Sequence, residues 1–407
     1  MRRLAPRIAA LLLLFVASAV RAAAPSVVLI SLDGTRPSDV RDLPTFQRIA
    51  REGAFGAGIV PAFPSNTFPN HVTFATGVSP DRHGIVNNVF LDPKRGLYRY
   101  SNDPAWIEVE PIWSIAARAG IPSASYFWTG SEGAWRNGLG PREWKAFDPK
   151  VSESEKVAQI LDWLTAPDPP RLVTSWFHGA DGAGHRYGPD TAEVAETLRA
   201  QDAALGALLD GLKARGLFAS TTVLLVSDHG MARVERSIDL EAVLAAAGIR
   251  ADVIGGGGFA TVRLRAPRKW LLLRRAPDAV AVARASGLQA WARGEAPPGL
   301  AIHNERFGDV VALAPLGTAI LGHTDSAGPA GAGPLRGAHG YSPELPEMTG
   351  LFAAVGRAVE PGAHPAAVRA VDVAPTVLSL LGVTEPEWME GRPVSLSASP
   401  RSSGPAR

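Results

Sequence analysis

The sequence predicts an α/β fold with a mostly parallel central sheet, because apolar β-branched runs alternate with helical patterns along the chain. Three runs are typical of buried strands, at residues 26–31 (SVVLIS), 172–177 (LVTSWF) and 221–227 (TTVLLVS). Helical periodicity is found at residues 44–53, 191–216, 240–248 and 371–381. Further short strands are expected at residues 260–264, 309–314 and 350–355.

The domain organisation follows from length and composition. The chain has 407 residues, of which 46% are hydrophobic, so it can bury a large core. We expect one main domain over residues 25–392, with a small β-rich insertion in the Gly- and Pro-rich stretch 255–336. Residues 393–407, rich in Ser, Pro, Gly and Arg, are expected to form a flexible C-terminal tail.

The N-terminus has the pattern of a signal peptide over residues 1–22. Arg2, Arg3 and Arg7 precede a short apolar run, and small residues around Ala22 suit cleavage after that residue. The sequence therefore predicts a secreted or periplasmic protein, with a retained N-terminal anchor as the alternative. No later apolar stretch is typical of a membrane-spanning helix.

The net charge gives no sign of a nucleic-acid partner. The formal charge is +2, but residues 1–22 contain four arginines and no acid, so the processed chain carries −2 (2 − 4 = −2). The chain also contains no cysteine, which excludes disulfides, a cysteine nucleophile and thiolate zinc sites. Any bound metal must be held by Asp, His, Glu or hydroxyl groups.

Acidic residues follow all three predicted buried strands. Asp33 comes directly after the first strand, Asp181 follows the second, and Asp228 and His229 follow the third. Parallel α/β sheets bind their ligands at the carboxyl ends of the strands. A single Asp in such a place is usually a helix cap or a turn former. Three of them, two accompanied by a nearby His, indicate a metal site at one edge of the sheet.

Two sets of ligands are available for this site. Asp181 and His185 are separated by Gly-Ala-Gly, which would let the backbone bend so that both side chains meet one ion. His339, in a glycine-rich loop, completes a three-ligand set with them. Asp33, Asp228, His229 and a hydroxyl make another set, as a two-metal site requires. Mixed imidazole and carboxylate ligands suit zinc, and other divalent transition ions are possible.

The hydroxyl is expected from Thr67, in the segment FPSNTFPNH that leads into a predicted helix over residues 68–77. A hydroxyl at a helix N-terminus faces backbone N–H groups and attracts phosphate. Metal coordination would make it a nucleophile. The alternative is that Thr67 or Ser65 only caps the helix. Asn88 could donate to a phosphate oxygen, or could be a turn residue.

Six motifs in order resemble the nucleotide pyrophosphatase/phosphodiesterase family of the alkaline phosphatase superfamily. They are SLDGTRP, FPSNTFPNHVTFATG, HGIVNN, DGAGHRYGP, VSDHGM and GAHGYSPELPEM, and the similarity runs from about residue 27 to 383. The resemblance implies an alkaline phosphatase-like fold and a phosphodiesterase catalytic domain. The chain looks like a compact bacterial form, without the additional modules of the larger animal members.

The resemblance also implies a role for each matching residue. Thr67 would be the nucleophile and a ligand of one zinc. Asn88 would bind a non-bridging phosphate oxygen together with the Thr67 backbone N–H. Asp33, Thr67, Asp228 and His229 would hold that zinc, and Asp181, His185 and His339 would hold the other. A phospho-threonine intermediate would form, and its hydrolysis would release a nucleoside monophosphate.

The expected substrates are nucleotide diesters. No arginine adjoins Thr67 to meet the additional charge of a monoester, and Phe68 and Phe147 are candidates to stack on a base, with core packing as the alternative for each. A phosphomonoesterase, a phosphonate hydrolase and a choline-phosphodiester lipase would keep the same ligands. A non-catalytic metal-binding protein would carry a broken ligand set or lack the nucleophile, and the sequence has neither defect. The sequence does not indicate an oligomeric state.

Overall fold

The strand expected at residues 26–31 is the central strand of a twisted, mostly parallel sheet. The structure is a computed structural model that describes residues 24–265, 278–297, 299–323 and 335–397. Strand β1 (Ser26–Leu32) lies between β8 (Leu172–Phe177) and β9 (Thr221–Val226) and runs parallel to both. All three strands are buried along their whole length, which explains their continuous apolar sequences.

The main sheet has seven strands in the described part of the chain, in the order β2-β18-β9-β1-β8-β6-β7. Strand β18 pairs antiparallel to β9, and β6 and β7 extend the parallel side. The remaining strands of this sheet are β2 (Ala54–Phe55), β6 (Ser123–Tyr126), β7 (Glu143–Lys145) and β18 (Phe352–Gly356). The predicted α/β class is confirmed, and the strand expected at 350–355 belongs to this sheet.

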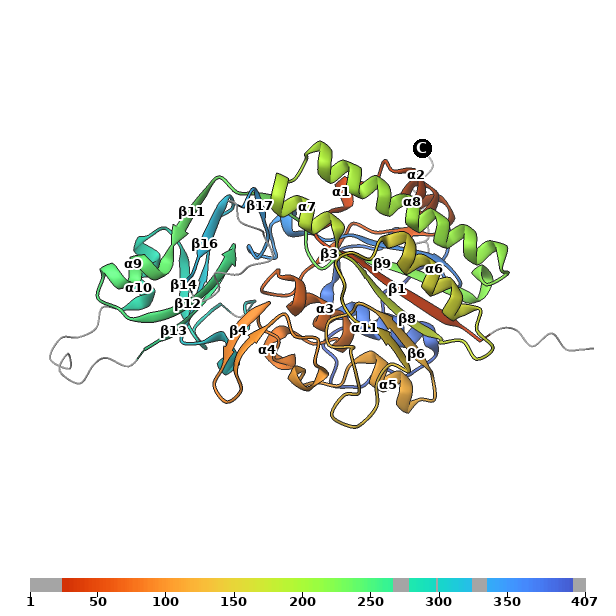
Figure 1. Cartoon of the computed structure of the whole chain (residues 1–407), viewed down its shortest axis with the longest axis horizontal. Helices are drawn as coiled ribbons and strands as arrows, with labels where there is room; N and C mark the ends of the chain where they lie inside the picture. The colour runs from red at the N-terminus through yellow and green to blue at the C-terminus, as the bar shows by residue number, and fades with distance from the viewer. Residues whose placement is uncertain (1–23, 266–277, 298, 324–334, 398–407) are drawn as a thin grey trace, which may run out of the picture.

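Helices cover both faces of the main sheet (Figure 1). The long helix α8 and its neighbours lie on one face: α1 (Pro37–Val40), α2 (Pro44–Glu52), α6 (Glu153–Leu164), α7 (Gly179–Tyr187) and α8 (Ala192–Ala214). The other face carries α3 (Thr67–Thr76), α4 (Pro80–His83), α5 (Ile112–Arg118) and α11 (Val373–Leu381). Helix α3 ends where the sequence predicts, because Gly77 adopts a left-handed conformation with φ of 70°.

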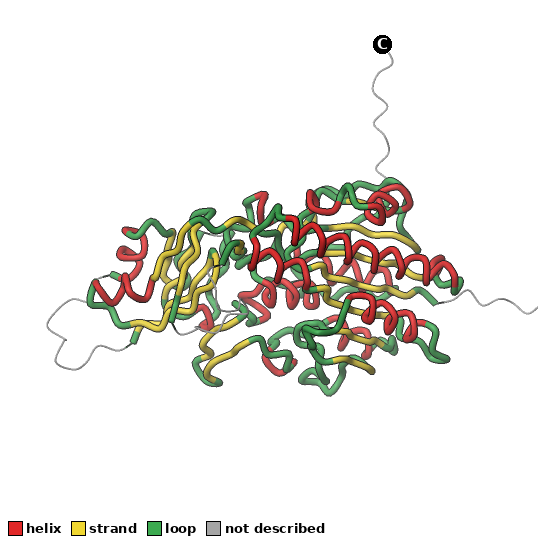
Figure 2. The backbone as a smooth tube through the Cα atoms, turned by 45° about the horizontal axis from the view of Figure 1, so that its top comes forward, coloured by secondary structure: helices red, strands yellow, loops and turns green. Residues whose placement is uncertain are grey.

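A second, six-stranded sheet forms a smaller lobe at one end of the molecule (Figure 2). Its strands, in spatial order, are β11 (Arg236–Asp239), β16 (Thr318–Leu321), β12 (Ala251–Gly257), β13 (Phe259–Leu264), β15 (Val310–Leu313) and β14 (Gln289–Ala292). Helices α9 (Leu240–Ala246) and α10 (Ala279–Ala285) pack beside it. The β-rich region therefore begins before residue 255, since β11 and α9 belong to it. The strands expected at 260–264 and 309–314 are β13 and β15 of this lobe.

Three short two-stranded ladders complete the described secondary structure. They are β10 (Ala232–Arg233) with β17 (Gly337–Ala338), β3 (Ile59–Val60) with β19 (Val368–Arg369), and β4 (Val89–Asp92) with β5 (Gly96–Arg99). The β10–β17 pair matters for the site, because it joins the segment after Asp228 to the segment before His339.

The beginning of the predicted tail packs on the main lobe. Leu396 is buried, and its carbonyl oxygen accepts a hydrogen bond from Glu360 N–H at 2.9 Å. Residues 393–397 of the predicted tail therefore contact the main lobe through an apolar side chain and a backbone hydrogen bond, and the tail boundary stays a prediction. Residues 398–407 and the predicted signal peptide lie outside the described residues. Among the helices of the described segments, none combines the length and apolar character needed to cross a bilayer.

Arg306 connects the small lobe to the β4–β5 hairpin. Its side chain is 6% exposed, and its guanidinium contacts the carboxylates of Asp92 at 2.7 Å and Glu108 at 3.1 Å. It also donates to the carbonyl oxygens of Gly84 at 2.8 Å and Trp106 at 3.1 Å. Such a buried cation is fully hydrogen-bonded, so its removal leaves several acceptors unpaired.

We predict that Arg306→Met lowers the free energy of unfolding by roughly 3–5 kcal/mol, because buried Asp92 and two carbonyls lose their donor. Unfolding in urea or guanidinium measures the free energy of unfolding of each protein. The matched control is Arg142→Met, which removes a surface pair with Asp168 and should cost about 0–1 kcal/mol. Equal losses for the two variants would contradict the anchoring role of Arg306.

Candidate metal centre and active site

Strand register brings the first two acidic groups together. Leu32 pairs with Phe177 of β8, and Ser31 pairs with Val226 of β9, so the chain leaves the sheet at the same level on neighbouring strands. Asp33 N–H donates to Phe177 O at 3.0 Å, and Gly34 N–H lies 3.4 Å from Asp228 Oδ1. The carboxyl ends of the parallel strands therefore meet at one edge, as expected.

Asp181 approaches the same edge on helix α7. A Cβ added at Gly34, whose φ is 64°, would lie 3.1 Å from Asp181 Cα, so the turn after β1 leaves little space beside the helix. The expectation that glycines bend the chain between Asp181 and His185 is wrong. The segment is helical, and the two residues share one face because they are four positions apart. Asp181 Oδ1 lies 3.3 Å from His185 Nε2.

The three histidines are held in the same tautomer by backbone carbonyls. His185 Nδ1 lies 2.9 Å from Gly337 O, His229 Nδ1 lies 2.9 Å from Gly230 O, and His339 Nδ1 lies 3.0 Å from Ser65 O. Each Nδ1 therefore carries the proton and donates it. The Nε2 atom of each ring points away from these carbonyls, and metal-binding histidines are commonly oriented in this way through their other ring nitrogen.

Three carboxylate oxygens lie close to the Nε2 atoms of His229 and His339. Asp228 Oδ2 lies 3.1 Å and Asp33 Oδ1 lies 3.5 Å from His229 Nε2, and Asp181 Oδ1 lies 3.7 Å from His339 Nε2. These three carboxylate oxygens are buried and have no hydrogen-bond partner among the described residues. Burial acts to lower the pKa of His229, but the carboxylate of Asp228 outweighs it and raises that pKa. A divalent cation would satisfy these oxygens and ring nitrogens together.

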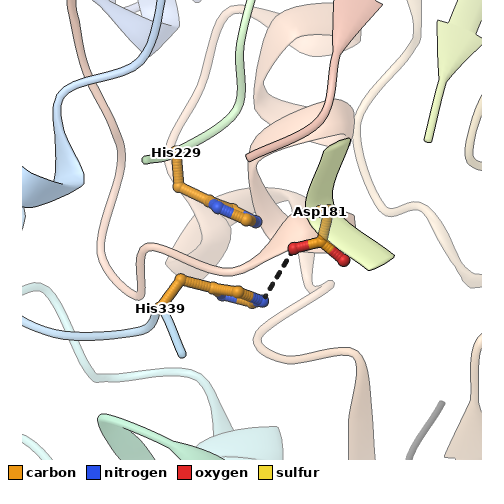
Figure 3. A group of neighbouring side chains, drawn as sticks. All are labelled: Asp181, His229 and His339. Atoms are coloured by element: carbon orange, nitrogen blue, oxygen red, sulfur yellow. Dashed lines mark ion pairs between the residues drawn. The ribbon is translucent and has the colours of Figure 1, made fainter. Parts of the chain in front are cut away.

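The site contains two groups of possible metal ligands, and within each group the donor atoms all lie within 4.8 Å of one another. One consists of Asp33, Asp228 and His229, and the other of Asp181, His229 and His339. Figure 3 shows the second group, with the His229 and His339 rings stacked and Asp181 facing them. The ring centroids are 3.7 Å apart, so the two predicted ligand sets adjoin. Because His229 is near both groups, its assignment to one ion stays a prediction.

The pKa values reflect the same crowding of charge. Burial, together with the carboxylates of Asp228 and Asp181, raises the pKa of Asp33 well above its usual range. Burial also lowers the pKa of His339 well below its usual value, and His229 and His185 add to this effect. A neutral His339 keeps its lone pair for a ligand. The donor set therefore fits divalent cations held by nitrogen and oxygen atoms.

Thr67 is the first residue of α3 and does not cap it. Asn66 is the N-cap residue, and Thr67 Oγ1 lies 3.1 Å from His229 Nε2, a member of both groups of donor atoms. The hydroxyl thus stands at a helix N-terminus, where the backbone dipole favours negative charge. Asn88 accepts a hydrogen bond from Phe68 N–H at 2.8 Å through Oδ1, which leaves its amide hydrogens for another acceptor.

A cavity of about 750 Å³ opens over this cluster, which is in the range of small-molecule sites. Asp33, Thr67, Asn88, Asp181, His185 and His339 line it, as do both predicted aromatic residues, Phe68 and Phe147. Phe68 is only 3% exposed, whereas Phe147 is 41% exposed and stacks on Trp176 with the centroids 5.4 Å apart. Among the described residues that line the cavity there is no lysine or arginine.

Sequence reasoning missed several residues of the site. Trp176 Nε1 donates to Asp33 Oδ2 at 2.9 Å, and Tyr100, Asn102 and His178 also line the cavity. Trp176 lies one residue before the end of a predicted buried strand. Because side chains alternate between the two faces of a strand, its position near the carboxyl end could have indicated a place beside the site. Tyr100 and Asn102 follow a hairpin with no sequence feature that indicates a ligand.

The chain is similar in sequence to a known family and to several curated proteins. Residues 27–342 match the family described as type I phosphodiesterase / nucleotide pyrophosphatase. Human ectonucleotide pyrophosphatase/phosphodiesterase family member 1 is 34% identical over 218 residues, which is 51% of this chain and 24% of the relative. An uncharacterised pyrophosphatase/phosphodiesterase of Schizosaccharomyces pombe is 36% identical over 218 residues, 45% of its length. The match thus spans a quarter to a half of these curated relatives.

Solved structures match over more of the chain. Murine ectonucleotide pyrophosphatase/phosphodiesterase 5, an inactive threonine-to-alanine variant in complex with AMP, superposes with a TM-score of 0.78 at 27% identity. The superposition covers 88% of this chain and 96% of the murine one. The human form of the same protein gives a TM-score of 0.78 at 26% identity, covering 89% and 96%.

We predict that metal removal destabilises the protein and that Asp33→Asn reduces this effect. The raised pKa of Asp33 means that the metal-free fold binds this proton more tightly than the unfolded chain, so its stability falls as the pH rises. In excess chelator at pH 8, Asp33→Asn should therefore melt roughly 2–4 °C higher than the wild type. Added Zn²⁺ should raise the melting temperature of the wild type more than that of the variant.

Thermal melts with and without chelator measure both effects. Asp42→Asn, at an exposed carboxyl, is the control and should behave as the wild type. A chelated Asp33→Asn protein that melts lower than the chelated wild type would contradict the repulsion inferred here.

Proposed function

Because the chain belongs to the type I phosphodiesterase / nucleotide pyrophosphatase family, we propose that it is a two-metal hydrolase of phosphodiester and pyrophosphate bonds in nucleotides. One observation carries the proposal: the Thr67 hydroxyl lies at a helix N-terminus against two adjoining groups of metal-ligand atoms. That combination supplies a nucleophile, a favourable field for phosphate and sites for divalent cations.

The proposed cofactors are two Zn²⁺ ions, with other divalent transition ions possible. Asp33, Thr67, Asp228 and His229 would hold one, and Asp181, His185 and His339 the other. When bound, the ions supply Lewis-acid stabilisation of charge on the reacting oxygens and lower the pKa of the nucleophile. The unpartnered carboxylate oxygens and the anchoring of the histidine rings through Nδ1 support this assignment.

In the proposed mechanism, Thr67 Oγ attacks phosphorus in line, and the bond from phosphorus to the leaving-group oxygen breaks as the new bond forms. The amide of Asn88 and the Thr67 backbone N–H donate to a non-bridging oxygen as its charge develops. Water then hydrolyses the phospho-threonine, which releases a nucleoside monophosphate and restores Thr67. The hydrogen bond from Phe68 N–H to Asn88 Oδ1 fixes the orientation that this role needs.

Charge favours diesters over monoesters. Two divalent cations bring +4 and the carboxylates of Asp33, Asp181 and Asp228 bring −3, so the loaded site would carry +1 while Thr67 keeps its proton (4 − 3 = 1). A phosphodiester carries a single negative charge and matches it, whereas a monoester dianion would need a further cation. The lining residues of the described cavity include neither lysine nor arginine to supply one.

The aromatic side of the cavity is proposed to bind the base. Phe147 is exposed and stacks on Trp176, and Phe68 packs edge-on against Trp176 and Tyr100. Together they present flat apolar surface next to the nucleophile. A stacked base gains about 1–3 kcal/mol from such a surface. The AMP in the complex of the murine relative supports a nucleotide as the ligand.

Export is also proposed, to the periplasm or the outside of the cell. The support is the sequence pattern of residues 1–22, with its basic start, short apolar run and small residues around Ala22. Mass analysis of the mature N-terminus from the native host would test cleavage after Ala22.

We predict that Thr67→Ala abolishes hydrolysis of thymidine 5′-monophosphate p-nitrophenyl ester, with kcat falling about a thousandfold or more, because the variant loses the hydroxyl that forms the covalent intermediate. Release of nitrophenolate measures the rate, and zinc analysis by mass spectrometry confirms metal retention. Thr67→Ser is the matched control and should keep part of the activity. Activity of Thr67→Ala near wild type would refute the nucleophile.

The same assay separates the competing activities. The wild-type enzyme should prefer the thymidine diester to p-nitrophenyl phosphate. A preference for the monoester would favour a phosphomonoesterase, and absence of turnover with a full complement of metal would favour a non-catalytic binding protein. Hydrolysis of p-nitrophenylphosphocholine or of a phosphonate monoester in preference to the nucleotide would favour the lipid or phosphonate alternatives.

We predict that Phe147→Ala raises KM for the thymidine ester about tenfold, because a base loses stacking worth about 1–3 kcal/mol. The KM for bis(p-nitrophenyl) phosphate, which has no base, should change much less. Trp144→Ala is the control, since Trp144 is equally exposed but does not line the cavity. A parallel rise in KM for both substrates would argue against a base-stacking role.

A further inference from the structure

The cavity continues past the metal ligands onto the small lobe. Ile254, Gly255 and Gly256 of β12, Leu321 of β16, and the following Gly322 and His323 line it there. We call these six residues the lobe wall. The wall adjoins the second ligand set, because Gly258 N–H, next to the end of β12, donates to His339 O at 2.8 Å.

The leaving group of the proposed reaction should meet this wall. In an in-line displacement the attacking and leaving oxygens lie on opposite sides of phosphorus, and two-metal sites stabilise one at each ion. The proposed ligand partition assigns Thr67 Oγ1, which lies 3.1 Å from His229 Nε2, to the ion held by Asp33, Asp228 and His229. The leaving oxygen therefore belongs on the side of Asp181, His185 and His339, which faces the small lobe.

The chemistry of the lobe wall is unsuited to a multiply charged group. Four of its six residues are glycine, leucine or isoleucine on strands β12 and β16, and a fifth is Gly322. The sixth, His323, has its Nε2 at 2.8 Å from Asp239 Oδ2, so a carboxylate already faces its ring nitrogen. A pyrophosphate leaving group carries several negative charges and is normally held by Lys or Arg donors. Around this cavity the described residues provide neither.

We infer, on the basis of the proposed function, that the substrates are nucleotide diesters whose leaving group is an uncharged alcohol such as a nucleoside, a sugar or an aryl alcohol, in preference to nucleoside triphosphates. The lobe wall is the specificity determinant. It offers apolar surface and backbone to an uncharged group and no fixed cation to a pyrophosphate.

The first test compares two substrates with the same nucleoside. Thymidine 5′-monophosphate p-nitrophenyl ester and thymidine 5′-triphosphate both have good leaving groups, but only the second leaves as a polyanion. The zinc-loaded wild-type enzyme should show kcat/KM at least about tenfold higher for the ester, equivalent to about 1.4 kcal/mol. Equal values, or a preference for the triphosphate, would overturn the inference and leave the proposed function standing. Hydrolysis of neither would refute the proposed function itself.

The second test introduces a positively charged side chain into the lobe wall. Gly256 has open space around an added Cβ and no left-handed φ, so a long side chain fits there. Gly256→Lys should raise the ratio of triphosphate to ester kcat/KM by about three- to tenfold. Gly256→Gln, of similar length and uncharged, is the matched control and should leave the ratio near that of the wild type.

A binding measurement keeps this test independent of turnover. In the Thr67→Ala background, calorimetry should show thymidine triphosphate binding about three- to tenfold tighter to the Gly256→Lys protein than to the Gly256→Gln protein. Thymidine monophosphate, which does not reach the wall, should bind both alike. Equal affinities for the triphosphate would show that the wall does not contact the leaving group.

Discussion

The structure depends on the convergence of three carboxylates, two buried and one partly buried, at the carboxyl ends of neighbouring parallel strands. Asp33 and Asp228 follow β1 and β9, and Asp181 comes from the helix after β8. Each has an oxygen without a partner among the described residues, so the metal-free site stores electrostatic repulsion. Divalent cations would convert that repulsion into attraction. Stability and function are therefore linked at this edge, in a chain with no disulfide to hold it.

Different structural elements around the carboxylates make different contributions to the site. The main sheet supplies the charges, and backbone carbonyls fix the histidine tautomers. Helix α3 supplies Thr67 and the positive end of its dipole. Trp176 has two roles, since its indole N–H donates to Asp33 and its ring stacks on Phe147. The proposed base-binding surface is thus rigidly connected to a ligand of the proposed nucleophile-side cation.

The small lobe contributes on the opposite side of the cavity. Its strands β12 and β16 form the lobe wall, and the bond between Gly258 and His339 ties that wall to the second ligand set. Arg306 holds the lobe against the β4–β5 hairpin. In this arrangement the reaction depends on the main lobe, whereas the choice of leaving group depends on the small lobe. A change of a few side chains on β12 or β16 could alter specificity without touching the ligands.

The sequence by itself determined the α/β class, the strands β1, β8 and β9, and the identity of the acidic residues after them, because burial of whole strands leaves a local apolar pattern. The six motifs further identified the family. Tertiary structure alone decided that Asp181 and His185 share a helical face, since two intervening glycines favour a loop locally while packing of α7 against α8 favours a helix. It alone revealed that His229 belongs to both groups of ligands and that the described residues lining the cavity include no lysine or arginine. These features depend on register and packing between segments more than a hundred residues apart, and no local pattern records them.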